Sequence, residues 1–152
     1  MKFRKFYKMK INYILVFFLL LIFFSCKDDR DKLPNVAVDI YINILSDPNY
    51  SDLQTVGNSI PITGGIKGIF LYRKSQSEIQ AYERACTFDP EGKCQRVIWE
   101  NGNSSDIIVV DTICNSRFLM ASDGIILEGS PAKMPLKQYN VVFNGEIVYI
   151  SN

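Results

Sequence analysis

The chain has 152 residues, about one domain's worth, of which 47% are hydrophobic, and it contains 17 Lys and Arg, 16 Asp and Glu and no histidine. Five basic residues and no acidic ones precede residue 25, so 12 basic residues remain against 16 acidic ones, a net charge of −4. A mildly acidic domain without a basic run gives no reason to expect a nucleic-acid partner, and the absence of histidine excludes Ser-His and Cys-His catalytic pairs.

The N-terminal segment, residues 1–25, has the pattern of a secretory signal peptide. The basic stretch "MKFRKFYKMK" precedes the apolar run "INYILVFFLLLIFFS", which is short for a membrane-spanning helix of ~20 residues. Cys26 after Ser25 resembles a bacterial lipobox, in which the cysteine is acylated and begins the mature chain, although Phe23 and Phe24 differ from the usual residues of that motif. The sequence therefore predicts lipidation of Cys26.

Residues 26–35 are predicted to be a tether between lipid and fold. The stretch "CKDDRDK" is charged, and no apolar periodicity begins before Val36. It resembles the Lys-Asp-Asp signal of Bacteroidota outer-membrane lipoproteins, and the alternative is a plain solvated linker. The expected location is the outer membrane, on the periplasmic or the surface-exposed side, with the acyl chains on Cys26 holding the protein to the bilayer.

Residues 36–152 are predicted to form one all-β domain, a small sandwich or barrel of short antiparallel strands. The first strand alternates with a period of two and places on one face Val36, Val38, Ile40, Ile42 and Ile44. The stretch "SDPNYSDLQTVGNS" combines turn formers with a single helical turn, and "IPITGGIKGIFLYRK" predicts two strands around Gly64-Gly65. "GGIKG" lacks the ending of a phosphate-binding loop.

Further along, "AYERA", "QRVIWE" and "IIVV" are short strand candidates, and "NGNSS" is a turn signal. The last hairpin is the clearest local prediction. "QYNVVF" and "EIVYIS" flank Asn144-Gly145, a pair that favours a type I′ turn. No segment has a long helical period, so the expected architecture is all-β.

The segments "CTF" and "DTICNSRF" resemble the two cluster-binding loops of a Rieske iron–sulfur domain, which have the forms Cys-x-His and Cys-x-x-His-Gly-Ser-x-Phe. Cys86 matches the first cysteine, Phe88 stands at the first histidine position, Asp111 at the second cysteine and Cys114 at the second histidine. The later "DGIILEGSPAKMPLKQY" resembles the rest of the family's pattern, and the chain is also similar to Bacteroidota lipoproteins with "YRKS" and "PLKQY" segments. The resemblance implies a degenerate Rieske-like domain.

The resemblance does not extend to the cofactor. A Rieske cluster needs two thiolates and two imidazoles, whereas this chain has no histidine. If Cys26 is lipidated, only Cys86, Cys94 and Cys114 remain, too few for an all-cysteine cluster. A zinc site of these three with Asp111 is conceivable, but none of the familiar paired C-x₂₋₄-C spacings occurs. The sequence therefore predicts no cofactor and no metal.

The resemblance implies that the two loops meet, and exported cysteines that meet commonly form disulfides. The preferred pair is Cys86 with Cys114, because both stand at former ligand positions. Cys94 is the alternative partner of Cys114, since Rieske domains often carry a disulfide from a cysteine just past the first ligand pair, and a local Cys86–Cys94 bond ranks below both. One thiol is left over in each case.

No catalytic residue is nominated, because carboxylate pairs such as Asp89 and Glu91 lie in the turn-like "DPEG". The sequence predicts a non-enzymatic, lipid-anchored envelope protein whose cluster-less domain has a structural or binding role. One alternative is a thiol-disulfide redox partner, although the chain has no CxxC motif. The other is electron transfer through a retained iron–sulfur centre, which rests on fold-level analogy alone.

Overall fold

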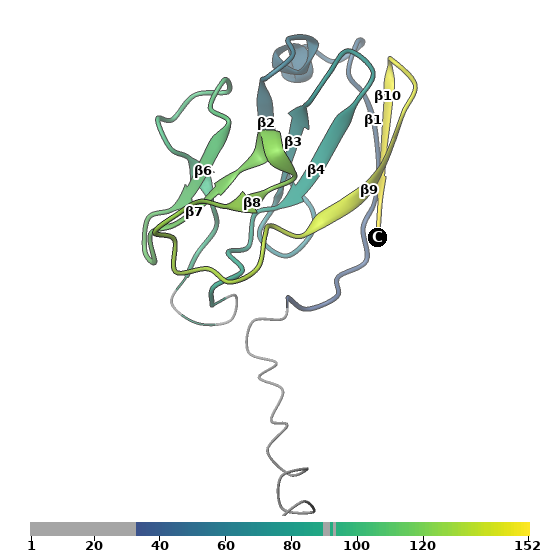
Figure 1. The fold of residues 1–152 in the computed structure, drawn as a ribbon. Coiled ribbons are helices and arrows are strands. Elements are labelled where there is room, and N and C mark those ends of the chain that lie inside the picture. Colours follow the sequence, from purple (N-terminus) through teal and green to yellow (C-terminus); the bar gives the residue numbers. More distant parts are fainter. Residues whose placement is uncertain (1–32, 90–91, 93) are drawn as a thin grey trace, which may run out of the picture.

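A computed structural model of the chain describes residues 33–89, 92 and 94–152. The predicted signal peptide, Cys26 and most of the predicted tether lie outside the described residues. The described part forms ten β-strands in two antiparallel sheets, joined by loops and two short 3₁₀ turns (Figure 1). The prediction of an all-β fold is confirmed. Within this part of the chain, no helix is long and apolar enough to cross a membrane.

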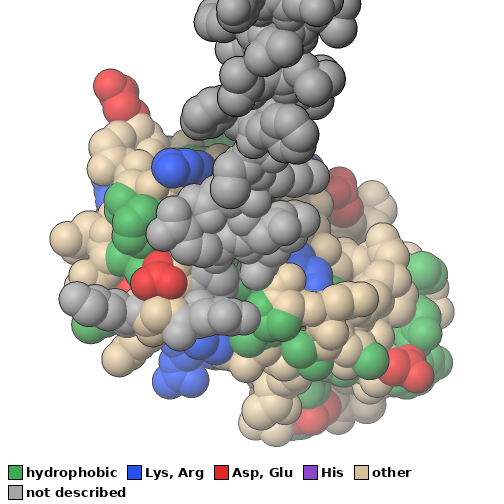
Figure 2. Space-filling view, turned by 90° about the horizontal axis from the view of Figure 1, so that it is seen from below, with side chains coloured by type: hydrophobic (Ala, Val, Ile, Leu, Met, Phe, Trp, Pro, Cys, Tyr) green, Lys and Arg blue, Asp and Glu red, His purple; other side chains and the backbone are tan. Residues whose placement is uncertain are grey.

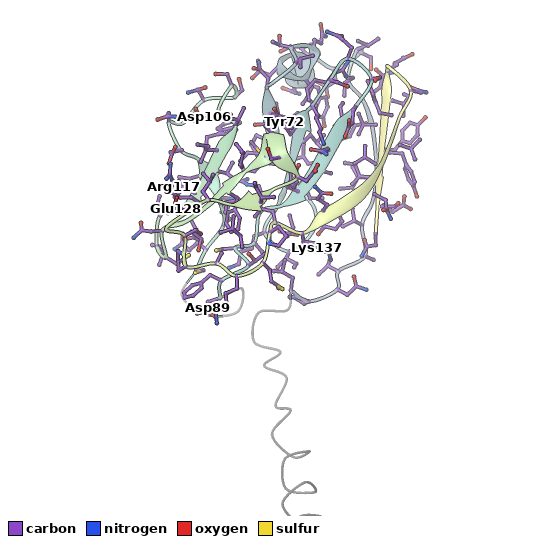
Figure 3. The ribbon with its side chains drawn as sticks, in the orientation of Figure 1. Tyr72, Asp89, Asp106, Arg117, Glu128 and Lys137 are labelled. Atoms are coloured by element: carbon purple, nitrogen blue, oxygen red, sulfur yellow. The ribbon has the colours of Figure 1, made fainter. Side chains whose placement is uncertain are left out.

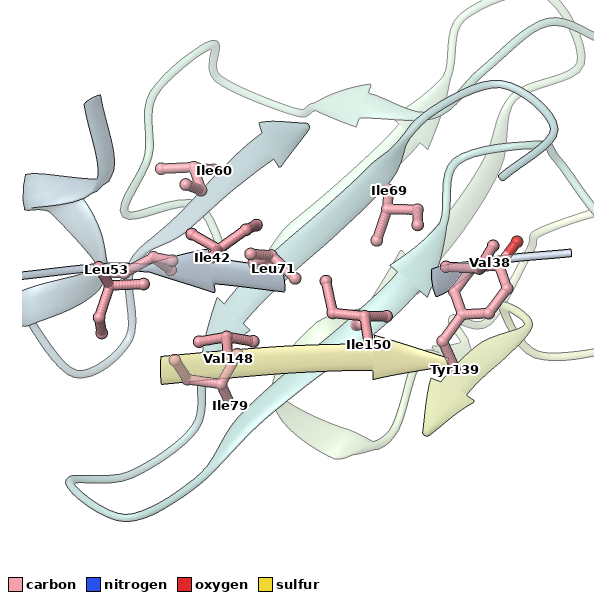
Figure 4. Close-up of a cluster of buried hydrophobic side chains, with 12 residues drawn as sticks. Val38, Ile42, Leu53, Ile60, Ile69, Leu71, Ile79, Tyr139, Val148 and Ile150 are labelled. Atoms are coloured by element: carbon pink, nitrogen blue, oxygen red, sulfur yellow. The ribbon is translucent and has the colours of Figure 1, made fainter. Parts of the chain in front are cut away.

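The larger sheet has six strands in the order β1-β10-β9-β4-β3-β2. The bounds of its strands are β1 Asp39–Asn43, β2 Ser59–Ile62, β3 Ile69–Arg73, β4 Ile79–Glu83, β9 Gln138–Phe143 and β10 Ile147–Ser151. The sheet curls so that β1 and the β2–β3 hairpin pack against one core (Figure 4), and Leu53 of the 3₁₀ turn η2 (Pro48–Gln54) packs in the same cluster. The predicted helical turn is thus present.

The predicted period of two in the first strand is visible in its burial. Val38, Ile42 and Ile44 are buried in the core of the larger sheet, whereas Tyr41 is 72% exposed on the other face. Because successive side chains of a strand point to opposite faces, this alternation fixes which face of β1 meets the core.

The smaller sheet has four strands in the order β5-β6-β7-β8, with the bounds β5 Ile98–Trp99, β6 Ile108–Asp111, β7 Ser116–Leu119 and β8 Ile125–Ile126. It shares a second core with the other face of the larger sheet. Ile69 and Leu71 of β3 point into the first core and Phe70 and Tyr72 into the second, so all five residues of β3 are buried. This position between two cores explains the continuous apolar run "IFLY".

The turn between β9 and β10 corrects one prediction. A type I′ turn needs positive φ at both central residues, but only Gly145 has one, at +100°. The Asn144 side chain instead accepts hydrogen bonds from the backbone N–H groups of Glu146 (3.0 Å) and Ile147 (2.7 Å). The hairpin is therefore present with a different turn, stabilised by an asparagine side chain that mimics a backbone turn.

Glu83, the last residue of β4, is a fully buried acidic side chain that joins three parts of the larger sheet. Its Oε2 accepts from the Ile66 N–H (2.7 Å) and the Tyr139 hydroxyl (2.6 Å), and its Oε1 accepts from the N–H groups of Lys67 (3.0 Å) and Ala85 (2.8 Å). Buried carboxyl groups persist in proteins where such donors replace water.

We expect Glu83→Gln to lower the free energy of unfolding by roughly 2–4 kcal/mol. The glutamine NH₂ group replaces one carboxylate oxygen, so the donors that this oxygen accepted from are left without an acceptor. The matched control is Glu78→Gln, since Glu78 is largely exposed and should change stability by less than about 0.5 kcal/mol. Urea unfolding of the full-length chain measures both. Equal stability of the two variants would show that the Glu83 network contributes nothing.

Candidate functional site

The first loop of the site follows β4 and carries Cys86 and Cys94. An isolated bridge between Ala85 and Arg96 closes it, and the Cys86 N–H donates to the Gln95 carbonyl at 3.4 Å. The two cysteines therefore lie at the base of the loop, one on each side, although seven residues separate them in the sequence. Both side chains are buried.

The second loop is the hairpin turn between β6 and β7, and it carries Asp111 and Cys114. The Asp111 Oδ1 accepts from the N–H groups of Ile113 (2.9 Å) and Cys114 (3.3 Å), and the Asp111 carbonyl accepts from the Asn115 N–H (2.8 Å). Asn115 closes the turn at φ +58°, a conformation that asparagine tolerates better than most residues. The sequence "DTICN" thus favours a turn that holds Cys114 between β6 and β7.

The two loops bring three thiols and one carboxyl group together. One potential ligand atom of each of Cys86, Cys94, Asp111 and Cys114 lies within 4.8 Å of each of the other three. The sulfurs of Cys86 and Cys114 are 3.4 Å apart as free thiols. We call this group of four residues the thiol pocket. Phe88 does not join it with its side chain, which is 38% exposed.

The thiol pocket lies in the second core, so its groups are largely removed from water. Cys86, Cys94 and Asp111 are buried and Cys114 is half-buried, which leaves a route to solvent at Cys114. The cysteines belong to the same apolar cluster as Phe118 and other side chains of the smaller sheet. The Asp111 Oδ2 is buried and has no hydrogen-bond partner. A buried carboxyl oxygen without a partner costs free energy, so this atom requires an explanation.

Several donors surround the sulfurs. The backbone of Phe88 and the Ser116 hydroxyl lower the pKa of the Cys86 thiol, and the Cys114 thiol donates to the Ser116 Oγ at 3.1 Å. The Lys67 ammonium group donates to the carbonyls of Cys94 (2.8 Å) and Gln95 (3.2 Å), which places one positive charge beside the first loop. The hydrogen bonds of Lys67 and Ser116 help to hold the two loops in place.

Burial is nevertheless the largest effect on the pKa values of Cys86 and Cys94. Desolvation, with a smaller contribution from the neighbouring thiols, raises the pKa of Cys86 to about 11 and raises the pKa of Cys94 above its ordinary value. In the absence of a cation, these thiols are neutral at pH 7. Reactive redox cysteines have the opposite shift, since the thiolate is the nucleophile.

Asp89, on the first loop, and Asp106 lie at opposite ends of the smaller sheet (Figure 3). The Asp106 carboxyl group accepts hydrogen bonds from Asn101 and Asn103 and belongs to a different turn. On the face seen in Figure 2, Lys and Arg side chains lie singly among hydrophobic and polar groups. Among the described residues, the thiol pocket is the densest group of potential metal ligands.

A search against models of known protein families and against curated proteins finds no match for this chain. The resemblance to Rieske domains therefore remains an interpretation of sequence motifs. The structure adds that Cys86, Asp111 and Cys114, three of the four positions singled out by that resemblance, lie together.

From the sequence, the absence of paired cysteine spacings argues against a zinc site of Cys86, Cys94, Cys114 and Asp111. The structure nevertheless brings the potential ligand atoms of all four residues together. That spacing rule applies where one loop supplies two ligands, whereas here the Ala85–Arg96 bridge brings two ends of a loop together. The available sequence signal for this turn was Asp111 itself, because an aspartate side chain commonly accepts a hydrogen bond from the backbone N–H group two residues on, here that of Ile113.

The predicted disulfide between Cys86 and Cys114 remains a prediction, and oxidation by glutathione disulfide tests it. The two thiols would lose two protons and two electrons, and the glutathione disulfide would be reduced to two thiols. We expect non-reducing peptide mapping to link the peptides of Cys86 and Cys114 and leave Cys94 free. The bond closes a loop of about 29 residues, so Cys114→Ser should cost ~3.5 kcal/mol in oxidised protein.

The same variant under reducing conditions is the control and should cost less. A link from Cys114 to Cys94 would mean that the partner was chosen wrongly. Three free thiols after oxidation would reject the disulfide altogether.

Proposed function

We propose that this chain is a lipid-anchored protein of the bacterial cell envelope, placed at the outer membrane on the periplasmic or surface-exposed side. Its β domain is a Rieske-like scaffold that has lost the iron–sulfur cluster and serves a structural or binding role rather than catalysis. The anchor is Cys26, and residues 26–35 are the tether to the domain. The proposed location is supported by the order of features along the sequence, which is a basic stretch, an apolar run, Ser25-Cys26 and an acidic tether.

The observation that carries the proposal for the domain is the approach of the Cys86 and Cys114 sulfurs to 3.4 Å. These cysteines come from two different loops, each held by its own backbone hydrogen bonds, and they stand where a Rieske domain has a thiolate and an imidazole. A link between the two loops would retain the structural role of the lost cluster. The domain then keeps its loops ordered without a redox centre.

Two further features favour a non-catalytic role. The chain has no histidine, and the buried carboxyl group of Glu83 is fully used by backbone and tyrosine donors. The buried, neutral thiols of Cys86 and Cys94 also disfavour a thiol-disulfide redox partner, which needs an accessible thiolate. The proposal therefore assigns no catalytic residue.

Changing Cys26 to Ser tests the anchor. The wild-type chain should sediment with outer membranes and be released only by detergent, because the buried acyl chains supply the membrane affinity. Without acylation at this position, the variant should lose this membrane-bound fraction. The wild-type chain expressed at the same level is the reference. A variant that fractionates with the outer membrane and resists release as the wild type does contradicts the lipoprotein proposal.

Anaerobic purification tests the loss of the iron–sulfur cluster. We expect no stoichiometric iron and no visible absorbance from a cluster, because Phe88 and Asp111 stand at positions where the cluster needs an imidazole and a thiolate. Iron analysis and an absorption spectrum of protein prepared with and without oxygen measure this. Stoichiometric iron with cluster absorbance in the anaerobic sample would instead support electron transfer.

A further inference from the structure

We propose that the thiol pocket of the reduced chain binds a single divalent metal ion of the zinc class through Cys86, Cys94, Cys114 and Asp111. This site goes beyond the proposed anchoring and structural role of the domain, and it does not depend on the lipid anchor. Three thiolates and one carboxylate are a ligand set suited to a borderline-soft, tetrahedral ion.

The first argument is the unpartnered oxygen of Asp111. This side chain is fully buried, its Oδ1 is used by two backbone N–H groups of the turn, and its Oδ2 has no hydrogen-bond partner. The three sulfurs of the pocket lie close to this carboxyl group. A cation bound between the sulfurs and Asp111 supplies the missing partner.

The second argument is distance. A zinc–sulfur bond of ~2.3 Å and tetrahedral angles place ligand sulfurs about 3.8 Å apart. The Cys86 and Cys114 sulfurs are 3.4 Å apart, and no two of the four ligand atoms are separated by more than 4.8 Å. These separations are close to those that a single tetrahedral ion requires. A two-iron cluster holds its ligand pairs on different metal atoms and needs them further apart, so the geometry favours one ion.

The third argument is the environment of the ligands. Binding breaks three S–H bonds, releases the three protons to solvent and forms three metal–sulfur bonds and one metal–oxygen bond. The complex then carries two net negative charges. The Ser116 hydroxyl lies 3.1 Å from the Cys114 sulfur, and the Lys67 ammonium group donates to the Cys94 carbonyl at 2.8 Å. Outer donors of this kind orient and stabilise metal-bound thiolates.

The metal ion and the predicted disulfide exclude each other. A bond between Cys86 and Cys114 removes two of the four ligands, so the site exists only in the reduced chain. Both links join the same two loops, and each satisfies the structural role proposed for the domain. Loss of metal binding would therefore leave the proposed anchoring and scaffold role untouched.

The test uses the full-length chain in detergent, reduced with a phosphine and titrated with Co²⁺ as the probe. We expect sulfur-to-cobalt charge-transfer absorbance and visible bands of tetrahedral Co²⁺ that saturate at one ion per chain, and we expect Zn²⁺ to displace the Co²⁺. Thermal unfolding followed by circular dichroism should shift to higher temperature with Zn²⁺, because the ion binds only the folded pocket.

The variants assign the ligands. Asp111→Asn keeps the acceptor of the turn and should weaken Zn²⁺ binding by more than the ~10- to 100-fold typical of an outer-shell loss. Cys94→Ser should remove one sulfur from the Co²⁺ spectrum and lower its charge-transfer intensity. The matched controls are Asp106→Asn, at the other end of the smaller sheet, and Cys26→Ser, and both should bind as the wild type does.

Absence of charge-transfer absorbance in the reduced wild-type chain would overturn the proposal, and this result does not depend on the folding of any variant. Unchanged Zn²⁺ affinity and spectra in folded Asp111→Asn and Cys94→Ser would also overturn it, since the ion would then bind elsewhere.

Discussion

The buried carboxyl group of Glu83 is the interaction on which the arrangement of the loops depends. It connects the turn at Ile66 and Lys67, Tyr139 of β9 and Ala85, the second residue after β4. A side chain at Gly65 would place its Cβ 2.3 Å from the Glu83 Oε2, so the turn needs glycine there for space as well as for its φ of +60°. The start of the Cys86 loop is therefore fixed from inside the larger sheet.

Short connections link the Glu83 carboxyl group to the thiol pocket. The Glu83 Oε1 holds the N–H groups of both Ala85 and Lys67, and the Lys67 side chain reaches the far end of the first loop at Cys94 and Gln95. The second loop is held independently by the Asp111 turn. Two separately ordered loops can present ligands with little loss of conformational entropy on binding, which favours a preorganised site.

Much of the fold could be predicted from local patterns. The alternation from Val36 to Ile44 and the paired runs around Gly64-Gly65 and Asn144-Gly145 gave the right strands, because strand burial and turn chemistry are local properties. The turn type at Asn144 was wrong, since the asparagine side chain competes with the backbone geometry that the dipeptide favours. The pocket could be predicted only in part. The sequence contains no signal for the role of Glu83, and it could not show that Cys94 and Asp111 meet, because both features depend on contacts between segments distant in sequence.

The central claim is that the two loops hold one metal ion between three sulfurs and one carboxylate oxygen. X-ray absorption at the zinc edge of the reduced, zinc-loaded chain tests it most directly. The account predicts three sulfur neighbours at ~2.3 Å and one oxygen at ~2.0–2.2 Å. A shell of light atoms alone, or a second metal atom close to the first, would contradict it.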